Sequence, residues 1–153
     1  DLREPLLLLG TCNGWGKDLE AARRRFAFAP AGAAAGEARL QVEMPDRKVS
    51  FQVVSARRLW DWRLHPAGDG KDAKELRCDC RVRGQLTRDR EDKAAHGRNF
   101  SIREAKGASV VVCVLLSARE GFQVWYARAA PMGLAAALPG PCVQRAEEVR
   151  DWR

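Results

Sequence analysis

Few side chains in this sequence have the types and the spacing that catalysis requires. Paired carboxylates stand at Asp69 with Asp72 and at Asp89 with Asp92, but Arg and Lys surround both pairs. Such a setting is typical of solvated ion pairs rather than of a general acid and base. Neither of the 2 His residues belongs to a catalytic motif, and no Gly-rich phosphate loop leads from a strand into a helix. We therefore expect no enzymatic activity and no cofactor.

Metal binding is also not expected from the cysteines. The chain has 5 of them, an odd number, so at least one has no partner within the chain. They are Cys12, Cys78, Cys80, Cys113 and Cys142. A single residue separates Cys78 from Cys80, which is shorter than the Cys-x-x-Cys step of zinc sites, and only His65 and His96 could complete such a site. We predict no metal site and thiols that are buried or idle.

The balance of charge is basic and depends on arginine. The 153 residues include 27 Lys and Arg against 20 Asp and Glu, and Arg supplies 21 of the 27. Its planar guanidinium makes bidentate contacts with carboxylate and phosphate, which suits RNA, an anionic membrane surface or an acidic protein. Trp60 and Trp62 could add base stacking, so a basic RNA-binding accessory protein is one alternative. No run of about 18 apolar residues could span a membrane, and peripheral membrane association stays open.

Short strands are the elements that must position these residues. Alternating or continuous apolar patterns predict strands at residues 6–9, 25–29, 39–44, 48–53, 81–86, 99–102, 109–116 and 122–126. A turn at 13–16 follows the first strand, and a hairpin is predicted across Met44 to Lys48. No helical period precedes residue 130. The pattern predicts an all-β fold, an immunoglobulin-like antiparallel β-sandwich of about seven or eight strands.

Two regions differ in composition from this pattern. Residues 67–95 are mostly charged, which predicts a long loop with one weak strand. Residues 129–153 are rich in Pro and Ala, and apolar side chains then recur every three residues, which favours one short helix from Val143. We therefore divide the chain into a sandwich at 1–128 and a tail at 129–153, which either docks on a partner or folds back on the sandwich.

Four segments carry a resemblance to a known family. The run Gly10-Thr11-Cys12-Asn13-Gly14-Trp15 follows a strand and resembles the opening of starch- and glycogen-binding modules. These are modules of the type found in the AMP-activated kinase β subunit and at the N-termini of branching and debranching enzymes such as isoamylase. Three later segments follow in the family's order: residues 49–54 resemble its "F-x-Y-K-F" strand, 62–66 its "W-x-x-D-P" segment and 97–102 its "G-x-x-N-x-x-I" strand. The resemblance covers roughly residues 5–128.

The resemblance implies a binding site for α-glucan. Two Trp side chains would stack on the apolar faces of sugar rings, and amides would bond the hydroxyl rims. The implied platform is Trp15 with Trp62, while Trp60 competes for the second place, and Asn99 would bond sugar hydroxyls. Gln52 stands where the family has a central Lys, and His65 stands where it has Asp before Pro. Because Gln52 lacks that charge and the 67–95 loop could cover the platform, we expect weak or absent glucan binding.

The hypothesis placed first is therefore a non-catalytic accessory subunit of a larger assembly, in which a glucan-module fold serves protein docking. The added loop and tail have no glucan role, and the arginine-weighted charge suits interfaces. Trp60, Trp152 and Arg150 are the candidate docking residues. By family analogy, the assembly would be intracellular and organellar, such as a photosynthetic complex of a plastid. Starch or glycogen binding is the first alternative, and RNA binding is the second.

Overall fold

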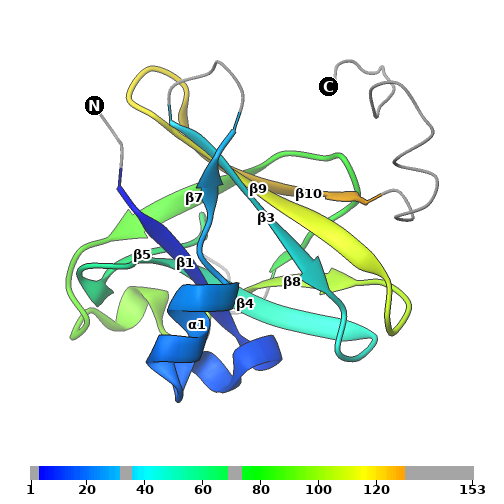
Figure 1. Cartoon of the computed structure of the whole chain (residues 1–153). Coiled ribbons are helices and arrows are strands. Elements are labelled where there is room, and N and C mark those ends of the chain that lie inside the picture. Colours follow the sequence, from blue (N-terminus) through cyan, green and yellow to red (C-terminus); the bar gives the residue numbers. More distant parts are fainter. Residues whose placement is uncertain (1–3, 32–35, 69–73, 130–153) are drawn as a thin grey trace.

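The computed structural model describes residues 4–31, 36–68 and 74–129. This part holds ten strands, one α-helix and two short 3-10 helices (Figure 1). In chain order they are β1 (Leu6–Gly10), η1 (Thr11–Gly16), α1 (Leu19–Arg25), β2 (Ala29–Pro30), β3 (Glu37–Glu43), β4 (Lys48–Ser55), β5 (Leu59–Pro66), β6 (Lys74–Glu75), β7 (Val82–Thr87), η2 (Lys93–Ala95), β8 (Phe100–Arg103), β9 (Ser109–Ser117) and β10 (Gly121–Arg128). Two of the strands, β2 and β6, have 2 residues each.

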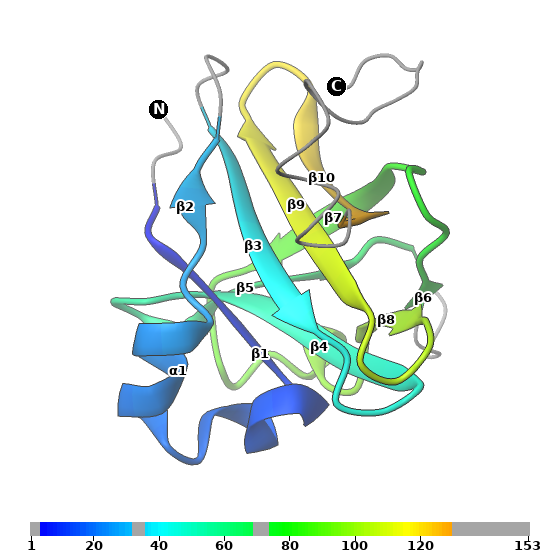
Figure 2. The same ribbon diagram turned by 45° about the vertical axis from the view of Figure 1, so that its right-hand side comes forward.

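The strands form one continuous sheet that folds over into two layers. Its order is β2-β3-β9-β10-β7-β5-β4-β8-β6, and β1 pairs with β4. Figures 1 and 2 show β3, β9 and β10 in one layer, with β1, β4 and β5 in the other. The β6–β8 pair is parallel, whereas the other strand pairs among the described residues are antiparallel. The predicted all-β sandwich is confirmed.

Strand β7 connects the two layers. Its first residues pair with β10, from Val82 to Gly84, and its later residues pair with β5, from Gly84 to Thr87. A methyl group on Gly84 would lie 2.9 Å from the nearest side-chain carbon of Leu64, so a glycine suits this crossing. Since β5 also pairs with β4, β7 fixes the position of the site-bearing strands relative to the second layer.

The core lies between the two layers. It contains the apolar side chains that alternate with polar ones along the predicted strands. Leu40 and Val42 face it from β3, and Phe51 faces it from β4. The rings of Phe51 and Phe100 lie 5.6 Å apart between centroids. Trp62 belongs to the same core and is 4% exposed. Burial of these apolar surfaces is the main stabilising contribution to the sandwich.

The predicted hairpin across Met44 to Lys48 is wrong. Strand β3 pairs with β2 and β9, whereas β4 pairs with β1, β5 and β8, so the connection passes from one layer to the other. Met44 is buried in this connection, where its N–H donates to the Ala108 carbonyl at 2.8 Å and its carbonyl accepts from Gly107 at 2.9 Å. An alternating pattern shows which face of a strand is buried but does not identify its neighbour.

Helix α1 was not predicted, and part of the strand expected at residues 25–29 is wrong because Arg25 ends this helix. Asp18 caps the helix by accepting the Ala21 N–H at 3.1 Å. Ala22 is its one buried residue and packs with Leu7 and Val54, so α1 covers the outer face of β1 and β4. Residues 26–28 do run beside β1, through backbone hydrogen bonds of 2.9 Å.

The tail at residues 130–153 lies outside the described residues, as do Asp69 and Asp72. The predicted helix from Val143 and the division at residue 128 therefore stay predictions. The described part of the chain contains no helix that is long and apolar enough to cross a membrane.

Candidate functional site

The segment after β1 is built to present Trp15. A methyl group on Gly10 would collide with the Ser50 carbonyl oxygen, so only glycine allows β1 to approach β4 this closely. Thr11 Oγ1 accepts the Ser50 N–H at 3.1 Å. Asn13 closes the turn, since its Oδ1 accepts the Gly10 N–H at 3.0 Å and its Nδ2 donates to the Leu8 carbonyl at 2.8 Å. Each polar residue of the motif thus fixes the backbone that carries Trp15.

Trp15 itself has an unusual backbone. Its φ of 58° lies in the left-handed region, between Gly14 at 62° and Gly16 at 80°. This conformation costs a residue with a side chain about 1–2 kcal/mol. Glycine could occupy all three positions without that cost, yet the middle one carries the largest side chain. Backbone strain of this kind is concentrated at functional sites.

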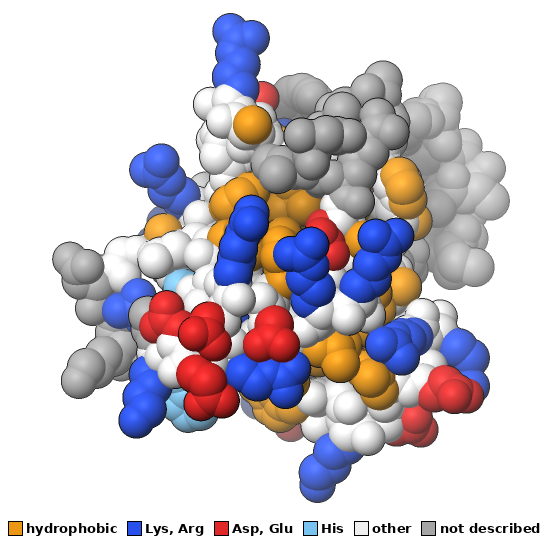
Figure 3. Space-filling model, turned by 90° about the vertical axis from the view of Figure 1, so that its left-hand side faces the viewer, with side chains coloured by type: hydrophobic (Ala, Val, Ile, Leu, Met, Phe, Trp, Pro, Cys, Tyr) orange, Lys and Arg blue, Asp and Glu red, His pale blue; other side chains and the backbone are white. Residues whose placement is uncertain are grey.

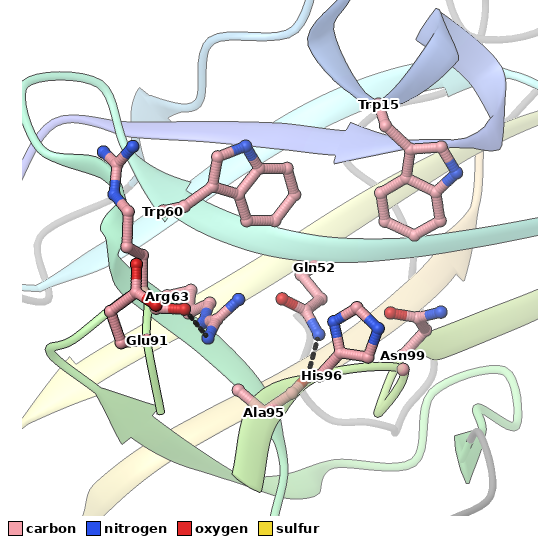
Figure 4. A pocket seen from close by; sticks show the side chains of 10 residues that line it. Trp15, Gln52, Trp60, Arg63, Glu91, Ala95, His96 and Asn99 are labelled. Carbon is pink, nitrogen blue, oxygen red and sulfur yellow. Dashed lines mark hydrogen bonds between the residues drawn. The ribbon is translucent and has the colours of Figure 1, made fainter. Parts of the chain in front are cut away.

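Trp60 is presented by a second backbone irregularity. The register of β4 and β5 shifts between Val54 and Ser55, and Leu59 has a φ of 52°. Trp60 therefore packs on the outer face beside Val54, while Trp62 lies in the core. The rings of Trp15 and Trp60 lie 6.4 Å apart between centroids, tilted by 38° (Figure 4). Both rings are half-buried.

A pocket of about 500 Å³ opens beside these two rings (Figure 4). It is lined by Trp15, Gln52, Trp60, Arg63, Arg90, Glu91, Ala95, His96, Gly97 and Asn99. Three of the four residues that the resemblance implied, Trp15, Gln52 and Asn99, therefore lie together. Trp62 does not line the pocket because it is buried between the layers, so the ring beside Trp15 belongs to its competitor, Trp60.

Residues 88–99, here called the pocket loop, form the wall opposite the tryptophans. Gln52 is buried, and its Nε2 donates to the carbonyls of Ala95 and Arg98, both at 2.8 Å. Arg63 is also buried, and its Nη2 donates to the carbonyl of Asp92 at 2.8 Å. The pocket loop is thus tied to the sheet by donors from β4 and β5, and it lines the pocket instead of covering the tryptophans.

An exposed ion pair orients Arg90 at the rim of the pocket. Arg90 Nε and Nη2 donate to the two carboxylate oxygens of Asp61, each at 3.0 Å. These hydrogen bonds hold the pKa of Asp61 below its usual range. Both side chains are about half exposed, so the pair sets geometry more than it adds stability.

His65 stands where the starch- and glycogen-binding modules that the sequence resembles have Asp before Pro, and it is a structural residue in this fold. It is fully buried, with Nε2 2.8 Å from Thr87 Oγ1 and Nδ1 3.1 Å from the Pro66 carbonyl. Since a carbonyl only accepts, Nδ1 carries the proton and Nε2 accepts from Thr87. Burial lowers the pKa of His65, so the ring is neutral at pH 7 and joins β5 to β7.

Four charged or titratable residues of the pocket were not expected from the sequence: Arg63, Arg90, Glu91 and His96. For Arg90 and Glu91 the only signal was the charged composition of residues 67–95, which favoured solvated ion pairs. Asp89 lies in the pocket loop, and its carboxylate accepts the Glu91 N–H at 2.9 Å, which holds the loop backbone. Among residues 4–31, 36–68 and 74–129, no group of three or more His, Cys, Asp or Glu side chains could hold a metal ion.

Charges of both signs occur on the left-hand side of the molecule in Figure 1. Figure 3 views that side and shows acidic side chains gathered next to hydrophobic surface, with Arg and Lys side chains around them. A surface that binds the phosphates of a nucleic acid would carry mainly positive charge. This face does not carry such an excess of positive charge.

Comparisons with known proteins add evidence on the fold. No family model matches the sequence, and no curated protein matches it. A solved structure described as the ligand-induced structure of AmyP-SBD, a starch-binding domain, is similar to this chain with a TM-score of 0.51 and 14% sequence identity. The match covers 85% of this chain and 75% of that one. This likeness shows a fold shared with a carbohydrate-binding module, but it does not single out the AMP-activated kinase type.

Proposed function

We propose that this protein is a non-catalytic carbohydrate-binding module that binds α-glucan of the starch type through Trp15 and Trp60. The observation that carries the proposal is the tilted pair of half-buried indole rings beside a pocket that also holds the amides of Gln52 and Asn99. The similarity to a starch-binding domain supports the same function.

The chemistry of glucan matches this arrangement. A glucose ring has apolar C–H faces and a rim of hydroxyl groups, so flat aromatic rings stack on the faces and amides bond the rim. Chains of α-linked glucose curve, and two rings tilted by 38° can meet successive sugars of a curved chain better than coplanar rings would. Asn99 and Gln52 both line the side of the pocket that the rims would reach.

From the sequence, the replacement of Lys by Gln52 and the charged 67–95 loop led us to expect weak or absent glucan binding. The geometry of the site bears on both features. Gln52 lacks the lysine charge, but its amide nitrogen holds the pocket loop and so shapes the site. Residues 88–95 of the charged region lie opposite the tryptophans and leave the pocket open. The accessory role in an organellar assembly, placed first from the sequence, has neither a contact nor a comparison in its support.

Calorimetric titration with maltoheptaose tests the proposal. Trp15→Ala and Trp60→Ala should each weaken binding at least about tenfold, because loss of a tryptophan anchor typically costs more than 1.4 kcal/mol. Phe122→Ala is a matched control, since this half-buried aromatic lies on β10 and does not line the pocket. Affinity that is absent in the wild type, or equal in all four proteins, would refute the proposal.

A further inference from the structure

Two buried polar atoms beside the pocket have no hydrogen-bond partner among the described residues. They are Gln52 Oε1, an acceptor, and Arg63 Nε, a donor. Gln52 Nε2 and Arg63 Nη2 are already in use, since they hold the pocket loop. Leaving such a group unpaired costs about 1–3 kcal/mol, so a buried pair of them indicates a missing partner.

The two side chains face each other along one surface of the sheet. Arg63 pairs with Val54 across β4 and β5, which places it on the same face as Gln52, two residues further along β4. Figure 4 shows the Gln52 amide with its nitrogen toward Ala95 and its oxygen toward the guanidinium of Arg63. Both side chains line the pocket, so the acceptor and the donor belong to the same wall of it.

The hydrogen-bonding pattern selects the missing partner. It must donate to Gln52 Oε1 and accept from Arg63 Nε, which a hydroxyl group can do with one oxygen atom. An ammonium cannot accept, and a carboxylate or phosphate oxygen without a proton cannot donate. A hydroxyl of a bound sugar and a water molecule both have the required chemistry.

We infer that Gln52 and Arg63 together bind one free hydroxyl group of the glucan and thereby determine which sugar position enters the floor of the pocket. The inference rests on the proposed glucan binding and extends it to a residue, Arg63, that the family pattern does not mark. A glucan in which that hydroxyl is substituted would leave the donor, the acceptor or both unpaired, so the protein would select unsubstituted chains.

Titrations of the full chain with methyl α-maltotrioside and its monodeoxy and mono-O-methyl analogues test the inference. One position should stand out: both its deoxygenation and its methylation should weaken binding at least about tenfold, because each leaves a buried group unpaired. Analogues changed at other positions should bind within about threefold of the parent. Since the change is made in the ligand, folding of a variant does not affect the result.

A variant identifies the protein side of the contact. Arg63→Lys keeps a donor for the pocket-loop carbonyls but removes Nε, so the penalty at the selected position should shrink several-fold while the other positions keep their values. Arg103→Lys is the matched control, because Arg103 Nε pairs with Glu75 outside the pocket. Its profile should equal that of the wild type.

The outcomes separate this inference from the proposed function. If the parent trioside and maltoheptaose both fail to bind, the proposed function and this inference fall together. If they bind but no single hydroxyl stands out, or a crystal structure of the complex shows water between Gln52 Oε1 and Arg63 Nε, the module binds glucan and only this inference is overturned.

Discussion

Trp60 and Trp62 stand two positions apart on β5, and in a regular strand they would share one face. The left-handed backbone at Leu59 and the register shift beside Val54 rotate Trp60 to the outer surface, while Trp62 stays in the core. From the sequence we placed Trp62 on the platform and Trp60 second, because the irregularity that reverses this order depends on tertiary pairing with β4.

Substitution of the two tryptophans should therefore change the free energy of unfolding by different amounts. Trp62→Ala should lower the free energy of unfolding by about 3–5 kcal/mol, since it empties a large volume in the core. Trp60→Ala removes a half-buried ring and should cost only about 1 kcal/mol. Equilibrium urea unfolding measures both values. Equal losses would contradict the different placements of the two rings.

Cys12 lies inside the motif that presents Trp15 and should be unreactive. Burial raises the pKa of its thiol to about 11, so at pH 8 only about 0.1% is thiolate, the reactive form. Cys80 is exposed and should be alkylated before Cys12. Timed exposure to iodoacetamide at pH 8, followed by mass spectrometry, gives both rates. Modification of Cys12 as fast as Cys80 would show that the turn at 11–16 opens.

At the scale of elements, the alternating patterns located the longer strands because one face of each strand is buried. They did not show that β3 and β4 lie in different layers, since alternation carries no information on neighbours. Helix α1 was missed because it has 7 residues and buries only Ala22, too few for a helical period. The pocket loop depends on donors from Gln52 and Arg63 to main-chain carbonyls, and main-chain contacts leave no residue pattern.

The connection between β8 and β9 is tied to β10 by a partly buried carboxylate. Glu104 accepts from Tyr126 Oη at 2.6 Å and from Arg128 Nε at 3.0 Å, and its side chain is 11% exposed. Burial acts to raise the pKa of Glu104, but the two hydrogen bonds outweigh it and lower the pKa. The charged form therefore stabilises the fold at pH values above the ordinary glutamate pKa.

Glu104→Gln should lower the free energy of unfolding by about 1–2 kcal/mol at pH 7, because it removes the charged acceptor. The depressed pKa means that the wild type loses this contribution as the pH falls from the ordinary glutamate range through the lowered pKa, so the difference between the two proteins should be smaller at about pH 3 than at pH 7. Urea unfolding at both pH values measures the difference. A loss of the same size at both would contradict the role of the charged carboxylate.

At the scale of the whole molecule, the net charge of +7 and the tryptophan pair suggest different ligands. Glucan is uncharged, so maltoheptaose affinity should change less than about twofold between 50 and 500 mM NaCl. Binding of single-stranded RNA through arginines would fall by orders of magnitude over this range. Titrations at several salt concentrations distinguish the two. A steep loss of maltoheptaose binding with salt would contradict a site built on apolar rings and amides.

The continuous sheet positions the side chains of the proposed glucan-binding site on one face of the molecule. The η1 turn after β1 carries Trp15 to the outer face on which β4 and β5 present Gln52, Trp60 and Arg63, and the pocket loop completes the site. The central claim is that this face, and no other aromatic surface of the sandwich, binds α-glucan.

Nuclear magnetic resonance of the tryptophan indole N–H groups tests that claim most directly. Each indole gives its own signal in the 15N-labelled full chain, so no substitution is needed to localise binding. On titration with maltoheptaose, the signals of Trp15 and Trp60 should move together and saturate at one affinity, while those of Trp62 in the core and Trp125 on β10 stay in place. Shifts at Trp62 or Trp125 with Trp15 and Trp60 unchanged, or no shift at any indole, would contradict the account.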